Sequence, residues 1–215
     1  MIKKTTEFND LKGKSVFITG GGAGIGAALT EGFVAQGSKV SFVQRSDGLE
    51  FCDKMEKKYQ NRPHYIKCDI SNIAALKKAI ADSSFKNGTI SILVNNAADD
   101  LRHSTLEVTE KFWDKSQALN LKAYFFASQS VIKGMLEIGE GSIVNMSSIS
   151  YMMGNSGYPS YVSANSGING MTRALAREFG LYKIRVNTIA PGWVMTEKQK
   201  KKWVTENLLR KHWKD

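Results

Sequence analysis

The chain has 215 residues, of which 42% are hydrophobic and 23% charged, as in a soluble domain with a sizeable core. Without a signal-peptide pattern or an apolar run long enough to cross a membrane, residues 1–215 are expected to form one cytoplasmic domain with no membrane partner. Half of the net charge of +10 lies in residues 198–215, and residues 197–215 are interpreted as a basic helix or tail. Nucleic-acid binding is disfavoured because no base-stacking motif accompanies this charge.

Short β-rich runs alternate with helical patterns along the chain. Strands are expected at 14–20, 39–44, 64–69, 90–97, 141–148 and 184–192. Helices are expected at 23–37, 47–60, 109–138 and 160–180, and a further helix is expected to begin after Ser71, its N-cap. Whether the helix at 109–138 is broken near residues 116–120 is left open. Because the strands are almost continuously apolar, they predict an α/β fold: a doubly wound parallel sheet of the Rossmann type, covered by helices on both faces.

A glycine-rich turn connects the first strand to the first helix. It contains Thr19, Gly20, Gly22, Gly24, Ile25 and Gly26. Glycines at this place let the backbone approach a pyrophosphate, whose charge a helix N-terminus stabilises. The turn therefore predicts a dinucleotide site, although a tight strand-to-helix turn would look similar.

The end of the second strand bears on the choice between NAD and NADP. Gln44 occupies the position where an acid would hold the ribose hydroxyls of NAD, and Arg45 follows it. An arginine suits a 2′-phosphate by charge and by its forked hydrogen bonds, so NADP is favoured over NAD. The alternative is a solvent-facing Arg45, with Asp47 contacting the ribose.

Polar residues also end the later strands. Asn96 and Ala97 follow the fourth strand, and Asp69 with Ile70 follows the third, where ligands of open α/β sheets lie. Either Ser147 or Ser148 can present a hydroxyl there, and Tyr161 begins the next helix. A serine and a phenol that meet at one substrate oxygen would suit carbonyl and alcohol chemistry. Cys52 and Cys68 lack metal-site spacing, so we expect free thiols and no metal.

Taken together, TGGGAGIG, NNAA, Asn120, NMSS, Tyr161 and PGWVMT resemble the short-chain dehydrogenase/reductase family over about residues 11–196. The resemblance implies that Ser148 and Tyr161 bind the substrate oxygen, that Tyr161 transfers the proton, and that Asn120 supports a water relay. It also implies that Val194 and Thr196 lie near the carboxamide of the nicotinamide and that Pro191 and Gly192 bind the cofactor. The helices at 109–138 and 160–180 match those through which family dimers pair.

Three longer segments, 95–109, 145–161 and 191–203, resemble bacterial sugar dehydrogenases that oxidise aldoses at the anomeric carbon to lactones. This resemblance implies a small-molecule substrate, a sugar. Its hydroxyls and apolar face would meet polar and aromatic side chains, for which the candidates are Arg102, His103, Asn155, Tyr158 and Trp193.

The sequence departs from the family pattern twice. Asn165 stands where the family has the lysine that binds the nicotinamide ribose and lowers the pKa of the tyrosine. We therefore expect folding and cofactor binding with impaired catalysis, or an inactive dinucleotide-binding or interaction protein as the alternative. The chain also stops about 40 residues before typical members do, so we expect six strands without the seventh and a changed tetramer surface.

Overall fold

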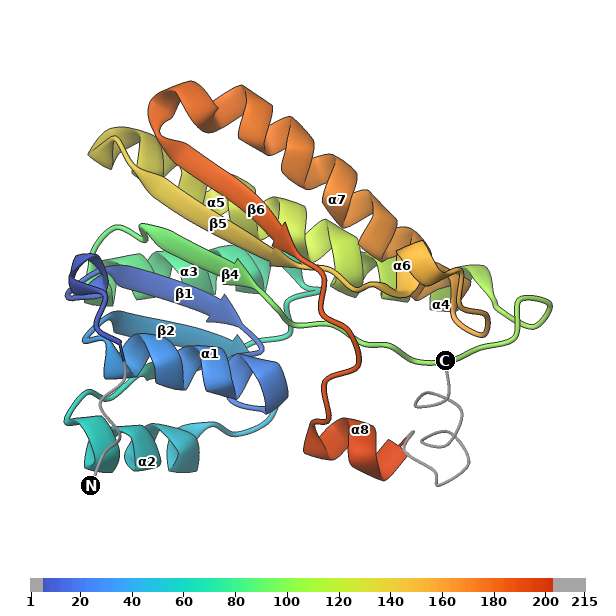
Figure 1. The fold of residues 1–215 in the computed structure, drawn as a ribbon, viewed down its shortest axis with the longest axis horizontal. Coiled ribbons are helices and arrows are strands. Elements are labelled where there is room, and N and C mark those ends of the chain that lie inside the picture. Colours follow the sequence, from blue (N-terminus) through green and yellow to red (C-terminus); the bar gives the residue numbers. More distant parts are fainter. Residues whose placement is uncertain (1–5, 203–215) are drawn as a thin grey trace.

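Six parallel strands form a single sheet in the computed structural model, which describes residues 6–202 (Figure 1). They are β1 (Ser15–Thr19), β2 (Lys39–Gln44), β3 (His64–Lys67), β4 (Ile92–Asn95), β5 (Gly141–Met146) and β6 (Ile184–Ile189). The strand order is β3-β2-β1-β4-β5-β6, and every pair is parallel. This confirms the predicted doubly wound, six-stranded sheet, whose order reverses between β1 and β4, where such folds bind ligands.

Helices cover both faces of the sheet (Figure 1). Phe17, Leu93 and Ile143 of the strands pack with α3 (Ile73–Asn87), α5 (Ala123–Ile138) and α7 (Pro159–Phe179) on one face. Val16 and Ile18 point the opposite way and pack with α1 (Gly24–Ala35) and α2 (Leu49–Tyr59). The strands are apolar on both sides because successive side chains alternate between these two layers.

The helical region expected at 109–138 contains the break that the sequence left open. Thr109 caps α4 (Glu110–Gln117) by accepting a hydrogen bond from the Phe112 N–H at 3.2 Å. A π-helical segment, Ala118–Lys122, then leads into α5 and contains the buried Asn120. Such wide turns recur at functional sites, and this one brings the Asn120 side chain toward the end of β4.

Two expectations about element boundaries were wrong. Asn72, not Ser71, caps α3, because its side chain accepts from the Ala75 N–H at 3.1 Å while the Ser71 hydroxyl is already donated to Asp69 at 2.7 Å. Most of the strands also end before the predicted residues: β3 stops at Lys67 and β6 at Ile189. The polar residues beyond these strand ends leave the hydrogen-bonded ladder and form the rim of the sheet.

The sequence also predicted a basic helix or tail at 197–215. Its first part is α8 (Glu197–Lys202), and residues 203–215 lie outside the described part of the chain. A short helix that was not predicted, α6 (Ser150–Met153), follows β5. No helix within residues 6–202 has the length and apolar character needed to cross a bilayer. Cys52 and Cys68 are both buried free thiols.

Candidate functional site

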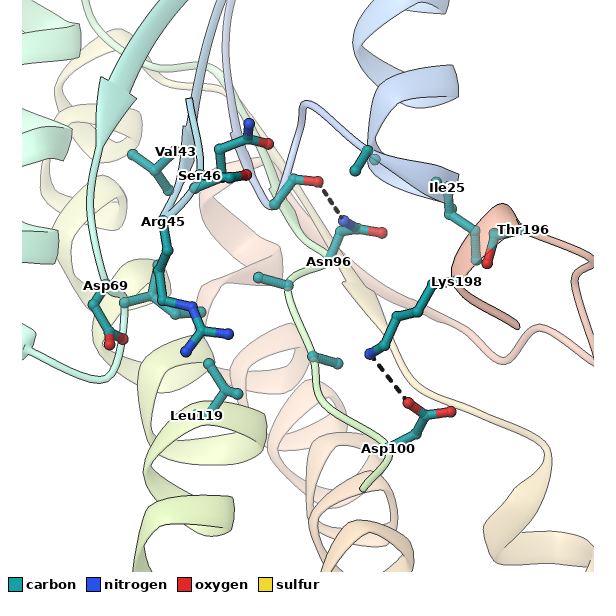
Figure 2. Close-up of a pocket in the computed structure, with 18 of the residues that line it drawn as sticks. Ile25, Val43, Arg45, Ser46, Asp69, Asn96, Asp100, Leu119, Thr196 and Lys198 are labelled. Atoms are coloured by element: carbon teal, nitrogen blue, oxygen red, sulfur yellow. Dashed lines mark hydrogen bonds and ion pairs between the residues drawn. The ribbon is translucent and has the colours of Figure 1, made fainter. Parts of the chain in front are cut away.

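A cavity of about 490 Å³ opens at the carboxyl ends of β1 to β4 (Figure 2). It brings together twelve of the residues predicted for the site: Gly20, Gly24, Ile25, Gly26, Gln44, Arg45, Asp69, Ile70, Asn96, Ala97, Tyr161 and Thr196. Asp100, Leu119, Lys198 and Gln199 also line it, and the sequence did not single these out. Residues separated by up to about 180 positions thus meet at the predicted edge of the sheet.

The glycine-rich turn can adopt its shape only without side chains at several positions. A Cβ atom on Gly26 would lie 1.9 Å from the Gly20 carbonyl oxygen, and one on Gly22 would lie 2.3 Å from Oε1 of Gln44. Gly20 and Gly24 have φ values of +69° and +54°, which L side chains rarely adopt. No side chain of the described residues caps the N-terminus of α1. This close backbone and uncapped helix start fit a diphosphate group.

Thr19 and Asn96 join β1 to the segment after β4. The Thr19 hydroxyl accepts from the N–H groups of Asn96 and Ala97 at 2.9 and 3.0 Å, and the Asn96 amide donates to the Thr19 carbonyl at 3.0 Å. Thr19 therefore shapes the cavity from behind without lining it. The neighbouring Asn95 is fully buried, and its amide donates to Asn145 of β5 at 2.9 Å, so it holds the sheet together.

Arg45 lies at the β2 end of the cavity, with its guanidinium directed into the open space near Asp69 and Leu119 (Figure 2). Gln44 packs against Gly22 and donates to the Asp47 carbonyl at 3.0 Å. The Asp47 carboxylate accepts from the Leu49 N–H at 3.0 Å, at the start of α2. Burial disfavours the charge of Asp69, but hydrogen bonds from Ser71 and the charge of Arg45 outweigh this and lower its pKa.

Tyr161 reaches the same cavity from the first turn of α7. Burial, which has the largest effect, raises the pKa of its phenol, and the charge of Asp100 raises it further. Hydrogen bonds with the side chains of Ser148 and Asn165 lower it, but the pKa stays above its usual value. The Ser147 hydroxyl donates to the Asn165 carbonyl at 3.1 Å, which leaves Ser148 as the serine beside Tyr161. The pair predicted from the sequence is thus assembled.

Asn165 is 2% exposed and does not line the cavity. Its amide donates to the backbone carbonyl of Tyr161, one helical turn earlier, at 2.9 Å. The amide is neutral, so Asn165 contributes no charge where the family pattern has a cation.

Asn120 lies beneath the cavity in a chain of hydrogen bonds. Its oxygen accepts from the Asp99 N–H at 2.8 Å, and its amide donates to the Ser116 hydroxyl at 3.2 Å. Ser116 in turn donates to Ser160 at 3.2 Å, and Ser160 pairs with Nε2 of His103 at 2.8 Å. This chain ties the start of α7, which carries Tyr161, to the π-helical segment.

None of the five residues predicted to face the substrate lines the cavity. Both ring nitrogens of His103 contact protein atoms, Ser160 and the Ser104 carbonyl. Arg102 lies over the Tyr158 ring, and the Asn155 amide donates to the Tyr158 hydroxyl at 3.4 Å. Trp193 donates to Gln199 at 3.0 Å. Because these side chains already contact other protein groups, the structure does not require a substrate to explain where they lie. Their role in substrate binding stays a prediction.

The segment after β6 crosses the mouth of the cavity. Thr196 lies against Gly24 of the glycine-rich turn, whereas Pro191 and Gly192 lie beside Ile149, and Val194 is 43% exposed. In α8, Lys198 donates to Asp99 and Asp100 at 3.2 Å each, and Gln199 donates to Asp100 at 2.7 Å (Figure 2). Asp100 is therefore a charged group near Tyr161 that only the fold reveals.

Comparisons with known proteins agree with this geometry. The model of the short chain dehydrogenase family matches residues 14–207. A Rhizobium meliloti protein named "Probable galactose dehydrogenase GalD" is 41% identical over 211 residues, 97% of this chain and 82% of that one. The D-xylose 1-dehydrogenase of Caulobacter vibrioides is 42% identical over 92% of this chain and 78% of its own.

A solved structure gives the same result. The crystal structure of a Sinorhizobium meliloti 1021 protein described as a short-chain alcohol dehydrogenase superposes with a TM-score of 0.84 at 30% identity. The match covers 94% of this chain and 79% of the other.

Within residues 6–202, no three His, Cys, Asp or Glu side chains gather in a way that could hold a metal ion.

Proposed function

The chain belongs to the short-chain dehydrogenase family, and from this we propose that it transfers a hydride between a nicotinamide dinucleotide and a sugar, oxidising an aldose to its lactone. The observation that carries the proposal is that Tyr161, hydrogen-bonded to Ser148, lines the same cavity as the glycine-rich turn. The galactose and xylose dehydrogenases among its relatives support the sugar.

In the oxidising direction, the Ser148 hydroxyl holds the reacting substrate oxygen by a hydrogen bond. The ionised phenol of Tyr161 takes the proton from that oxygen, acting as general base. A dinucleotide bound in the cavity would accept the hydride from the carbon that carries that oxygen. Gly24 and Gly26 would offer backbone N–H groups to its phosphates, and Asn96 shapes the wall beside them. Because the ionised form of Tyr161 is required and its pKa is raised, the rate should rise with pH.

We further propose that the cofactor is NADP, because Arg45 points into the cavity while the Asp47 carboxylate is bound to the start of α2. Arg45→Gln should weaken NADP⁺ about 10- to 100-fold, since charge-assisted hydrogen bonds contribute about 1.5–3 kcal/mol. Affinity for NAD⁺ should stay within about twofold, and Arg62→Gln, which removes a charge outside the cavity, should change neither. Titration of cofactor fluorescence measures both; equal losses for the two cofactors would contradict the assignment.

The whole proposal is tested by following the absorbance of reduced cofactor with a panel of aldoses and polyols at pH 7 and pH 10. Turnover of an aldose, greater at pH 10, is expected. The second candidate is a dinucleotide-binding protein without activity, which the uncharged Asn165 beside Tyr161 favours. Tight NADPH binding with no turnover at either pH, for any compound in the panel, would support that candidate.

The site is further proposed to work in a homodimer that pairs through α4, α5 and α7. Large apolar side chains are exposed on this surface, with Phe125 at 41% and Trp113 at 37%. Light scattering should give twice the chain mass of 23.8 kDa. Phe125→Asp should shift the protein to monomer, whereas Phe85→Asp, at a 96% exposed position on α3, should not. A monomeric wild type at micromolar concentration would contradict the proposal.

A further inference from the structure

Arg102 and Tyr158 form a contact that ends at Tyr161. The Arg102 guanidinium carbon lies 3.6 Å from the centre of the Tyr158 ring, within the range of a cation–π interaction. The Tyr158 ring in turn stacks on Tyr161, with the two ring centres 5.6 Å apart and the planes 16° from parallel. These two distances keep the guanidinium within about 9 Å of the Tyr161 ring.

Tyr158 is held in place between these neighbours. It is 4% exposed, and its hydroxyl accepts a hydrogen bond from the Asn155 amide at 3.4 Å. The N–H groups of Tyr161 and Val162 both donate to the Tyr158 carbonyl, at 3.0 and 3.1 Å. A ring fixed at both its backbone and its hydroxyl can transmit the position of Arg102 to Tyr161.

Charged and titratable groups approach Tyr161 from several elements. Asp100 comes from the segment after β4 and is paired with Lys198 of α8. Tyr124 comes from α5, and Tyr158 lies immediately before α7, which carries Tyr161. Asp100 disfavours the phenolate, and Lys198 is shared between Asp99 and Asp100. The two side chains that hydrogen-bond to the phenol, Ser148 and Asn165, are both uncharged, so they do not offset the charge of Asp100.

We propose that Arg102 is a positioning residue for proton transfer, which acts through the stacked ring of Tyr158 to orient Tyr161 and to offset the negative charge of Asp100. The inference rests on the proposed dehydrogenase function and adds a role that the sequence did not indicate, since Arg102 was expected to contact the substrate. The cation lies on the side of Tyr158, outside the cofactor cavity, so its effect should appear in the proton-transfer step and not in cofactor binding.

The size of the effect follows from the distance. One charge at about 9 Å, partly screened at an effective dielectric of about 40 to 80, changes the stability of the phenolate about two- to fivefold. Arg102→Gln should therefore lower kcat at pH 7 by about two- to fivefold and leave the KM for NADP⁺ unchanged. Arg102→Lys, which retains a cation over the ring, should recover most of the loss.

The matched control is Arg173→Gln, which removes the same charge from an exposed position on the helix that carries Tyr161, about three turns away. Tyr158→Leu should cause a loss at least as large as Arg102→Gln, and adding Arg102→Gln to it should cause no further loss. Additive losses in the double variant would overturn a route through Tyr158.

A direct titration separates this inference from the proposed function. In full-length protein with ¹³C-labelled tyrosine rings, the Tyr161→Phe spectrum identifies the Tyr161 resonance among those of the seven tyrosines. The Tyr161 resonance should titrate at higher pH in Arg102→Gln than in the wild type, and Arg173→Gln should match the wild type. If the resonance shifts but no sugar is turned over, the role of Arg102 is supported and the proposed sugar dehydrogenase activity is contradicted. If sugar is turned over but Arg102→Gln titrates like the wild type, the role of Arg102 is overturned.

Discussion

Asn165→Lys should raise kcat/KM at pH 7 by about 100- to 1,000-fold. A cation about 4 Å from the phenolate, at an effective dielectric near 20, contributes up to about 4 kcal/mol, or about a thousandfold in ionisation. Residues 161 and 165 are one helical turn apart and share a face of α7. The lysine would also break the hydrogen bond from Asn165 to the Tyr161 carbonyl. Steady-state rates with the best aldose, measured from pH 6 to pH 10, give the gain.

Asn165→Met is the control for this gain, because methionine also replaces the amide with a longer chain but carries no charge. It should not exceed the wild-type rate at pH 7. In Asn165→Lys the rise of activity with pH should move to lower pH, because the cation favours the ionised phenol. Equal rates for the wild type and Asn165→Lys at pH 7 would show that the missing charge does not limit this protein.

Tyr161→Phe should lower kcat by about 100- to 10,000-fold, the usual contribution of a positioned general base. The remaining phenyl ring keeps the stack on Tyr158, so the free energy of unfolding and the affinity for the dinucleotide should stay close to wild type. Because burial and Asp100 raise the pKa of Tyr161, the wild-type rate should increase from neutral to high pH, and the variant should lose that increase.

Tyr182→Phe removes a phenol that is 56% exposed in the short 3₁₀ helix (Gly180–Tyr182) that follows α7, and it should leave the rate unchanged. Chemical denaturation and cofactor titration on both variants separate lost chemistry from lost structure. A Tyr161→Phe protein that retains the pH-dependent rate would assign the proton transfer to another group. Asp100, a carboxylate of the cavity whose charge acts on Tyr161, would be the first candidate.

Much of the fold could be predicted from the sequence because its signals are local. The strands are rich in apolar residues, β1 to β4 each end in a polar residue, and the turn at Gly20–Gly26 allows few other conformations. Two strands were predicted to include Asp69 and Pro191. These residues lie outside the hydrogen-bonded ladder, so β3 ends at Lys67 and β6 at Ile189. The cap of α3 was misplaced by one residue because Ser71 and Asn72 are both good caps, and only the contact with Asp69 decides between them.

The rest of the site depends on contacts between distant segments. Asp100 and Lys198 are 98 residues apart, and nothing in the sequence around either one indicates that they meet. The same holds for His103, whose hydrogen bond with Ser160 makes it a support for α7 in the structure. For His103 the side-chain type suggested a substrate contact, but for all three residues the positions of neighbouring elements decide what each side chain contacts.

The hydrogen bonds between Thr19 and Asn96 have a consequence for the kinetics of binding. They join the two walls of the crevice through protein groups alone, so this part of the chain has little conformational entropy left to lose when a ligand arrives. Association there should resemble docking to a rigid surface, with a rate set by diffusion and orientation. Slow steps should instead trace to α8, whose contacts with Asp99 and Asp100 lie across the entrance.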